Sequence, residues 1–103
     1  MIHISKLTRT LMHEIDHLAQ GHYLDVRCYK KDRAIYFIKE DENIYHIIED
    51  GFKNNEFHMT FQEIEPLLKK LIKREFPRSN QIHLDKMGVY NASSHKRING
   101  NKS

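Results

Sequence analysis

The sequence has too few of several features to belong to some common classes of protein. It has one cysteine, Cys28, among 103 residues, so no internal disulfide can form. No apolar run approaches the ~20 residues that a membrane-spanning helix needs, and the chain starts without the apolar stretch of a signal peptide. These absences indicate a cytoplasmic protein that does not contact a membrane.

No charge of one sign dominates the composition. Seventeen Lys and Arg oppose 14 Asp and Glu, and the resulting net charge of +3 is too small to require a nucleic-acid partner. The chain is 39% hydrophobic and 30% charged, which is typical of a folded protein. We expect a single α+β domain over residues 1–87 and a mobile, basic, polar tail over residues 88–103.

The first regular pattern predicts an amphipathic helix over about Ser5 to Gln20. Ser5 is a suitable N-cap, and Gly21 stands where a left-handed residue would end the helix. The apolar residues recur at spacings of three and four, namely Ile4, Leu7, Leu11, Ile15 and Leu18.

The pattern between Tyr23 and Met59 has a period of two, which is typical of strands. Three apolar runs, 23–29, 34–39 and 44–48, are separated by short polar turns, and residues 57–59 are a possible fourth strand. Because short links favour hairpins, we expect an antiparallel sheet.

A second amphipathic helix follows the predicted strands. Thr60 and Glu63 form a capping box, and Pro77 ends the helix. Pro66 either distorts the first turn or stands near the first position of a later-starting helix. The predicted fold class is therefore α+β, a short antiparallel sheet of three or four strands between an N-terminal and a C-terminal amphipathic helix.

The first helix contains the one motif that is typical of catalysis. Residues 13–18 read His-Glu-Ile-Asp-His-Leu, which satisfies the His-Glu-x-x-His pattern of zinc hydrolases. This segment resembles the metal-binding helix of peptide deformylases. The resemblance implies that His13 and His17 bind a metal, zinc or iron, and that Glu14 is the catalytic base.

Two interpretations of this motif stay open. Peptide deformylases take a third ligand from a cysteine that precedes this helix, whereas no cysteine precedes His13. At about 100° per residue, His13 and His17 lie opposite the apolar stripe and are expected to face solvent. The motif is then either an exposed polar face or a metal-dependent, hydrolase-like site whose third ligand would be His3, His22 or Cys28.

A second group of candidate residues lies around the first predicted turn. Arg27, Tyr29, Lys30, Lys31 and Arg33 combine basic and aromatic side chains, which is typical of surfaces that bind protein partners or stack nucleic-acid bases. Single tyrosines and lysines are also common in strands and turns for structural reasons alone.

The two middle strands are apolar on both faces of the predicted sheet. Two helices cover one face, so the other face is expected to stay partly exposed unless a partner covers it. Self-association is therefore a further hypothesis.

Other chemistry has no motif in the sequence, since there is no Gly-rich phosphate loop, cysteine pair or nucleophile elbow. The sequence thus favours a small binding or regulatory protein without a cofactor, whose partner is another protein, a second copy or nucleic acid. The alternative is the metal-dependent site on the first helix.

Overall fold

The computed structural model describes residues 1–93 and has six strands and two helices there. The elements are β1 (Ile2–His3), α1 (Ile4–Asp16), β2 (His22–Arg27), β3 (Ala34–Asp41), β4 (Ile44–Asp50), β5 (Asn54–Met59), α2 (Phe61–Glu75) and β6 (Gln81–Val89). Most of the predicted tail, residues 94–103, lies outside the described residues, while Gly88 and Val89 end strand β6.

Helix α1 buries the predicted stripe of Leu7, Leu11 and Ile15. Its N-cap is His3 rather than Ser5, because the His3 ring accepts the backbone N–H of Ser5 at 3.2 Å. The helix ends at Asp16, four residues before the expected end at Gln20. The stripe has its last buried residue at Ile15, and Gly21 adopts its positive φ of 83° only after a further turn.

The strands form one antiparallel sheet in the order β1-β6-β2-β3-β4-β5. The prediction of an α+β protein with an antiparallel sheet is confirmed, but the expected number of three or four strands is wrong. The two strands that were missed are β1, which is only two residues long, and β6, which lies between β1 and β2.

Helix α2 begins at Phe61 and contains Pro66. The regular helix therefore starts before the proline and not at it. The Glu63 carboxylate accepts the Thr60 backbone N–H at 2.9 Å and the Thr60 hydroxyl at 3.0 Å. These two bonds satisfy the backbone N–H and the hydroxyl of Thr60, and they supply the Glu63 half of the predicted capping box.

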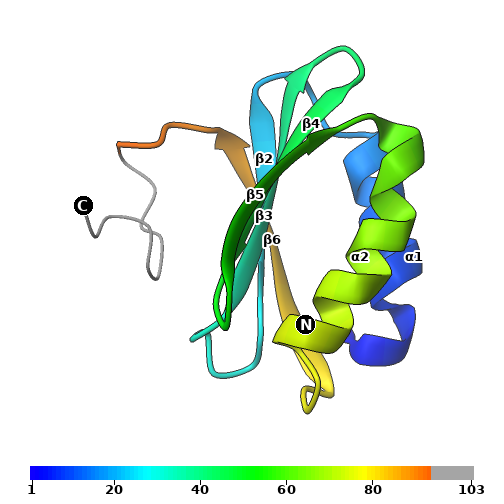
Figure 1. Ribbon diagram of the computed structural model, residues 1–103, viewed down its shortest axis with the longest axis vertical. Helices are drawn as coiled ribbons and strands as arrows, with labels where there is room; N and C mark the ends of the chain where they lie inside the picture. Colours follow the sequence, from blue (N-terminus) through cyan, green and yellow to red (C-terminus); the bar gives the residue numbers. More distant parts are fainter. Residues whose placement is uncertain (94–103) are drawn as a thin grey trace.

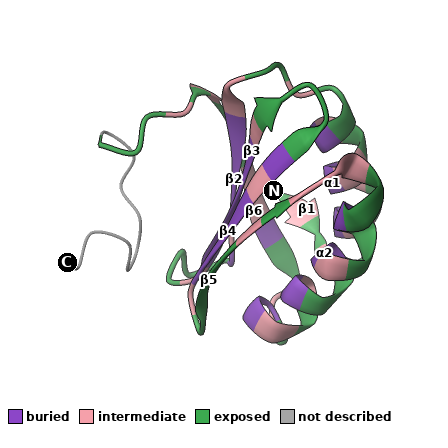
Figure 2. Cartoon of the chain, turned by 45° about the horizontal axis from the view of Figure 1, so that its top comes forward, coloured by how far each residue is buried: buried purple, intermediate pink, exposed green. Residues whose placement is uncertain are grey.

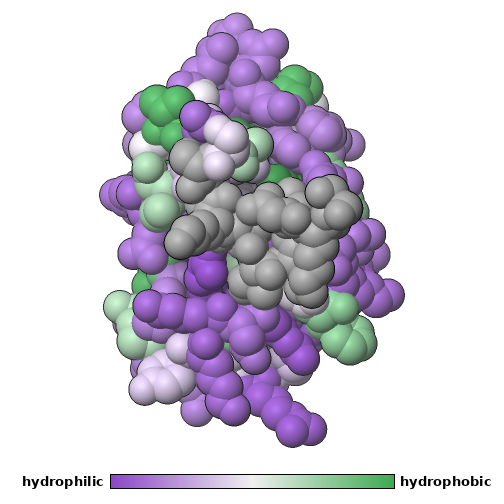
Figure 3. All heavy atoms as spheres, turned by 90° about the vertical axis from the view of Figure 1, so that its left-hand side faces the viewer, coloured by the Kyte–Doolittle hydropathy of each residue, from purple (hydrophilic) through white to green (hydrophobic). Residues whose placement is uncertain are grey.

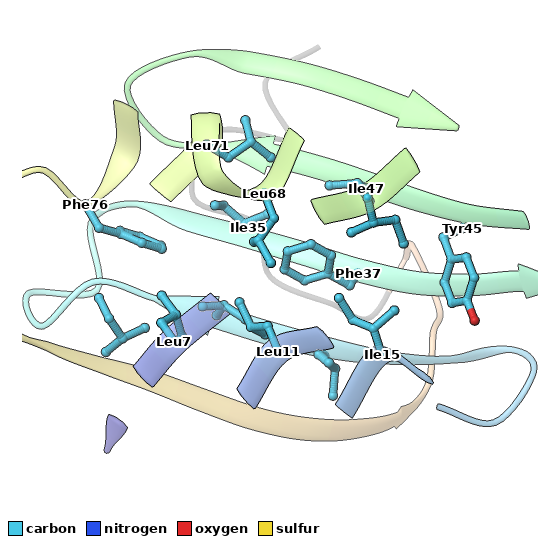
Figure 4. Close-up of a cluster of buried hydrophobic side chains, with 14 of the residues drawn as sticks. Leu7, Leu11, Ile15, Ile35, Phe37, Tyr45, Ile47, Leu68, Leu71 and Phe76 are labelled. Carbon is cyan, nitrogen blue, oxygen red and sulfur yellow. The ribbon is translucent and has the colours of Figure 1, made fainter. Parts of the chain in front are cut away.

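Both helices cover the same face of the sheet, as Figure 1 shows. The buried sides of the helices face the strands (Figure 2), and the core between the layers is closed by aliphatic and aromatic side chains (Figure 4). Its fully buried members include Leu7, Leu11, Ile15, Ile35, Phe37, Ile47, Leu68 and Leu71. This core holds both helices against one face of the sheet. The loops at the ends of the strands remain available to form sites.

The opposite face of the sheet, which we call the open face, differs from the sequence expectation. Its apolar side chains are buried rather than partly exposed, namely Tyr23, Ala34, Tyr36, Ile38 and Ile48, with Tyr90 packed against them. Where described residues form the surface on this side, the surface is mostly hydrophilic (Figure 3). The argument for self-association from an exposed apolar face is therefore not supported, and self-association stays a prediction.

Neither helix within residues 1–93 has the length and apolar character that crossing a bilayer would require. The cytoplasmic localisation stays a prediction from the sequence.

Candidate functional site: a basic cleft beside an exposed tyrosine

An open cleft of about 720 Å³ lies at one end of the sheet, between the β2–β3 loop and the α2–β6 loop. Both loops lie at the lower end of the molecule in Figure 1. The lining comes from the two loops and the ends of their neighbouring elements: Cys28, Tyr29, Lys30, Asp32, Arg33, Glu75, Pro77, Arg78, Ser79, Asn80 and Gln81.

The β2–β3 loop is held in place by its own backbone. The Cys28 N–H donates to the Arg33 carbonyl at 3.0 Å, and the Lys31 N–H donates to the Cys28 carbonyl at 2.9 Å. Lys31 adopts a φ of 61°, which allows the chain to reverse there. These bonds fix the positions of Tyr29 and Lys30 between them.

Tyr29 presents an aromatic surface beside the cleft. It is 65% exposed, and its ring lies nearly parallel to that of His83, with centroids 6.2 Å apart and 21° between the planes. The Nε2 atom of His83 lies 3.2 Å from the Tyr29 carbonyl oxygen, within hydrogen-bonding distance. Tyr29 thus lies next to the His83 ring and keeps most of its surface exposed.

The charge around the cleft is predominantly positive. Lys30, Arg33 and Arg78 bring three cations, and Asp32 is the one exposed carboxylate in the lining. The thiol of Cys28 donates to Asp32 at 2.9 Å, and this hydrogen bond is the main reason that the pKa of Asp32 lies below its ordinary value. Asp32 therefore remains ionised and offsets only part of the positive charge.

The second carboxyl of the lining, Glu75, is buried and faces the protein. Its oxygens accept the N–H groups of Phe52 at 2.7 Å and Lys53 at 3.1 Å. Burial, followed by the hydrogen bond with Glu49, raises the pKa of Glu75 and favours its neutral form.

The structure places four of the five predicted surface residues on the loop at the cleft and the fifth, Arg27, elsewhere. Tyr29, Lys30 and Arg33 line the cleft, and Lys31 is exposed at the tip of the same loop. Arg27 lies on the open face instead, where it pairs with Asp25 through two hydrogen bonds of 2.8 and 3.1 Å.

The α2–β6 half of the cleft was missed from the sequence. Arg78 and His83 follow Tyr29 by about fifty positions, and no local pattern links the two segments. Their proximity comes from β6 pairing with β2 at Arg27 and His83, a pairing that the sequence did not predict.

The predicted metal motif lies on the exposed side of α1. His13 and His17 are exposed with ring centroids 4.3 Å apart, and His17 Nδ1 lies 2.8 Å from the His13 carbonyl oxygen. Glu14 pairs with Lys86 at 3.1 Å.

Within residues 1–93, no third ligand joins the two histidines of α1. The group of three metal-ligating side chains that does come together there lies elsewhere, at Glu40, His46 and His58. Metal binding by His13 and His17 stays a prediction.

Comparison with models of protein families, with curated proteins and with solved structures found no significant match to this chain. The function is therefore argued from the chemistry of the site.

Proposed function

We propose that this protein is a small binding protein that holds single-stranded nucleic acid in the cleft between the β2–β3 and α2–β6 loops. The observation that supports the proposal best is the exposed ring of Tyr29, backed by His83 and flanked by the cations of the cleft. Aromatic rings stack bases, and neighbouring Lys and Arg side chains neutralise the phosphates.

The size and polarity of the cleft favour a nucleotide segment over a protein partner. A volume of about 720 Å³ is in the range of small-ligand pockets, which suits a base and its phosphate rather than a duplex. Apart from the tyrosine, the exposed lining is mostly charged or hydrogen-bonding, with Ser79, Asn80 and Gln81 beside Arg78. A protein-binding hot spot would instead have a predominantly apolar and aromatic centre.

Six of the lining residues have a defined role in this proposal. Tyr29 stacks a base, Lys30 and Arg78 contact phosphates, and Asn80 and Gln81 offer donors and acceptors to sugar or base edges. Arg33 is partly occupied, since its guanidinium lies 5.4 Å from the centre of the Phe52 ring and 3.5 Å from the Glu75 carbonyl oxygen. It contributes charge more than a direct contact.

Fluorescence anisotropy with a labelled single-stranded oligonucleotide tests this proposal. We expect Tyr29→Ala to weaken binding roughly 5- to 150-fold, because one stacked base contributes about 1–3 kcal/mol. Lys30→Ala and Arg78→Ala should each reduce the slope of log K against log salt by about 0.7, the value for one phosphate contact with a single strand.

Lys70→Ala is the matched control, since Lys70 is an exposed lysine of α2 that does not line the cleft. It should bind like the unmodified protein. Affinity that does not depend on salt, or that is unchanged in both Tyr29→Ala and Arg78→Ala, would show that the cleft does not bind nucleic acid.

A further inference from the structure

A cluster of histidines and glutamates lies on the open face of the sheet, away from the cleft. His46 of β4 and His58 of β5 are direct cross-strand partners, and their rings are stacked 4.2 Å apart at 12°. Directly opposed residues of an antiparallel pair point to the same face, so the register alone places these two imidazoles together.

Glu40 brings a carboxylate to the two rings from the end of β3. The pairing of β3 with β4 shifts register between Lys39 and Asp41, and Glu40 is the residue at this irregularity. Its Oε1 lies 3.2 Å from His58 Nε2, and its Oε2 lies 3.9 Å from His46 Nδ1. One ligand atom from each of the three side chains lies within 4.8 Å of the other two.

A second carboxylate orients His46. Glu56 Oε1 lies 2.7 Å from His46 Nε2, so this nitrogen donates its N–H to the Glu56 carboxylate, and the other nitrogen, Nδ1, faces Glu40. Histidines that bind metals commonly donate their second ring N–H to a carboxylate, which fixes the ring and its tautomer.

We propose that Glu40, His46 and His58 bind a divalent transition metal such as Zn²⁺, with Glu56 as the carboxylate that positions His46. The ligand atoms are His46 Nδ1, His58 Nε2 and a carboxylate oxygen of Glu40. Two imidazoles and a carboxylate suit zinc, and three protein ligands leave a fourth position open.

The exposure of two of the three ligands gives the site room to close around an ion. Tetrahedral zinc at about 2.0–2.1 Å from each ligand needs ligand atoms about 3.4 Å apart. The three ligand atoms now lie within 4.8 Å of one another, so the most distant pair must come closer together. Glu40 and His58 have side chains that are 42% and 56% exposed and are able to move. His46, at 16% exposed and tied to Glu56, is the fixed ligand.

Zinc titration of the untagged, chelator-treated protein tests the site, with the metal measured by elemental analysis and by competition with a chromophoric chelator. We expect one Zn²⁺ per chain at neutral pH. Binding should weaken at least tenfold in His46→Ala and in His58→Ala, and about 10- to 100-fold in Glu56→Gln, which keeps the ligands but alters the orienting group. Acidic pH should weaken binding, because protons compete for the ligating nitrogens.

The double variant His13→Ala/His17→Ala is the matched control, because it removes two neighbouring histidines that lack a third ligand within residues 1–93. It should keep the stoichiometric zinc. Glu40→Gln and His58→Gln repeat the test with exposed, nearly isosteric changes, and the circular dichroism of each metal-free variant checks its fold. No stoichiometric zinc in the unmodified protein, or zinc that is lost with the α1 pair and kept in the folded His46 and His58 variants, would overturn the proposal.

Discussion

Glu75 links the cleft to the interior of the protein through a pair of buried carboxyl groups. Its partner Glu49 accepts two hydrogen bonds from the Arg74 guanidinium, at 2.7 and 2.8 Å, and one from the Asn55 amide at 2.9 Å. Burial by itself would raise the pKa of Glu49, but its hydrogen bonds with Arg74, Glu75 and Asn55 outweigh burial and lower that pKa to about 2.

The two carboxyl groups predict contributions to stability with opposite pH dependences. Glu49 stabilises the fold fully above its ordinary pKa of 4.5, and this contribution is lost as the pH falls toward about 2. The raised pKa of Glu75 has the opposite effect. Its contribution is complete below the ordinary value of 4.5 and is lost as the pH rises through the folded-state pKa. Urea unfolding across this pH range measures the free energy of unfolding directly.

Glu75→Gln separates the two contributions. The amide is neutral at every pH. Its single oxygen accepts one of the Phe52 and Lys53 N–H groups, which donate to different oxygens of Glu75, and its NH2 group is a donor for Glu49. We expect this variant to lose the decline in stability that the unmodified protein shows as the pH rises above 4.5. Glu65→Gln, an exposed change on the same helix, should keep it. The same decline in Glu75→Gln as in the unmodified protein would count against a role for Glu75.

At the scale of elements, the sequence predicts those whose apolar pattern is regular. The stripe of Leu7, Leu11 and Ile15 predicts α1, and the two-residue period of residues 34–48 predicts the central hairpin. Strand β6 could not be predicted in this way, because only Ile82 in it is fully buried and polar residues occupy much of its length. Pairing with β1 and β2 imposes its extended conformation.

The candidate sites also differ in whether a local sequence pattern or only strand pairing brings their residues together. The Tyr29–Arg33 cluster is local and was found, but Arg78 and His83 reach it only through the pairing of β6. His46 and His58 are twelve positions apart, and only the register of β4 with β5 shows that they face each other.

Ile82 tests whether β6 is a structural part of the sheet. It is fully buried against the core that includes the helices, and it pairs with Ile2 of β1. We expect Ile82→Ala to lower the free energy of unfolding by about 2–5 kcal/mol, the usual cost for an aliphatic core residue. The neighbouring exposed change Gln81→Ala should alter it by less than about 0.5 kcal/mol. Equal effects in the two variants, measured by urea unfolding, would contradict the place of β6 in the core.

At the scale of the whole molecule, the two proposed sites lie at opposite ends of β3. The strand begins at Ala34, directly after the loop that lines the cleft, and Glu40 lies near its other end. Helices α1 and α2 occupy one face of the sheet (Figure 1), and α2 reaches the cleft only with its last residue, Glu75. Variants at one site therefore serve as controls for the other.

The most direct test of the proposed function is a map of where nucleic acid contacts the folded protein. A short single-stranded oligonucleotide is titrated into ¹⁵N-labelled protein, and the backbone amide shifts are followed by NMR. The account predicts that the largest changes fall on residues 28–33 and 78–83, the two segments that meet at the cleft. Changes concentrated on the exposed faces of α1 and α2, or no changes with an excess of oligonucleotide, would contradict it.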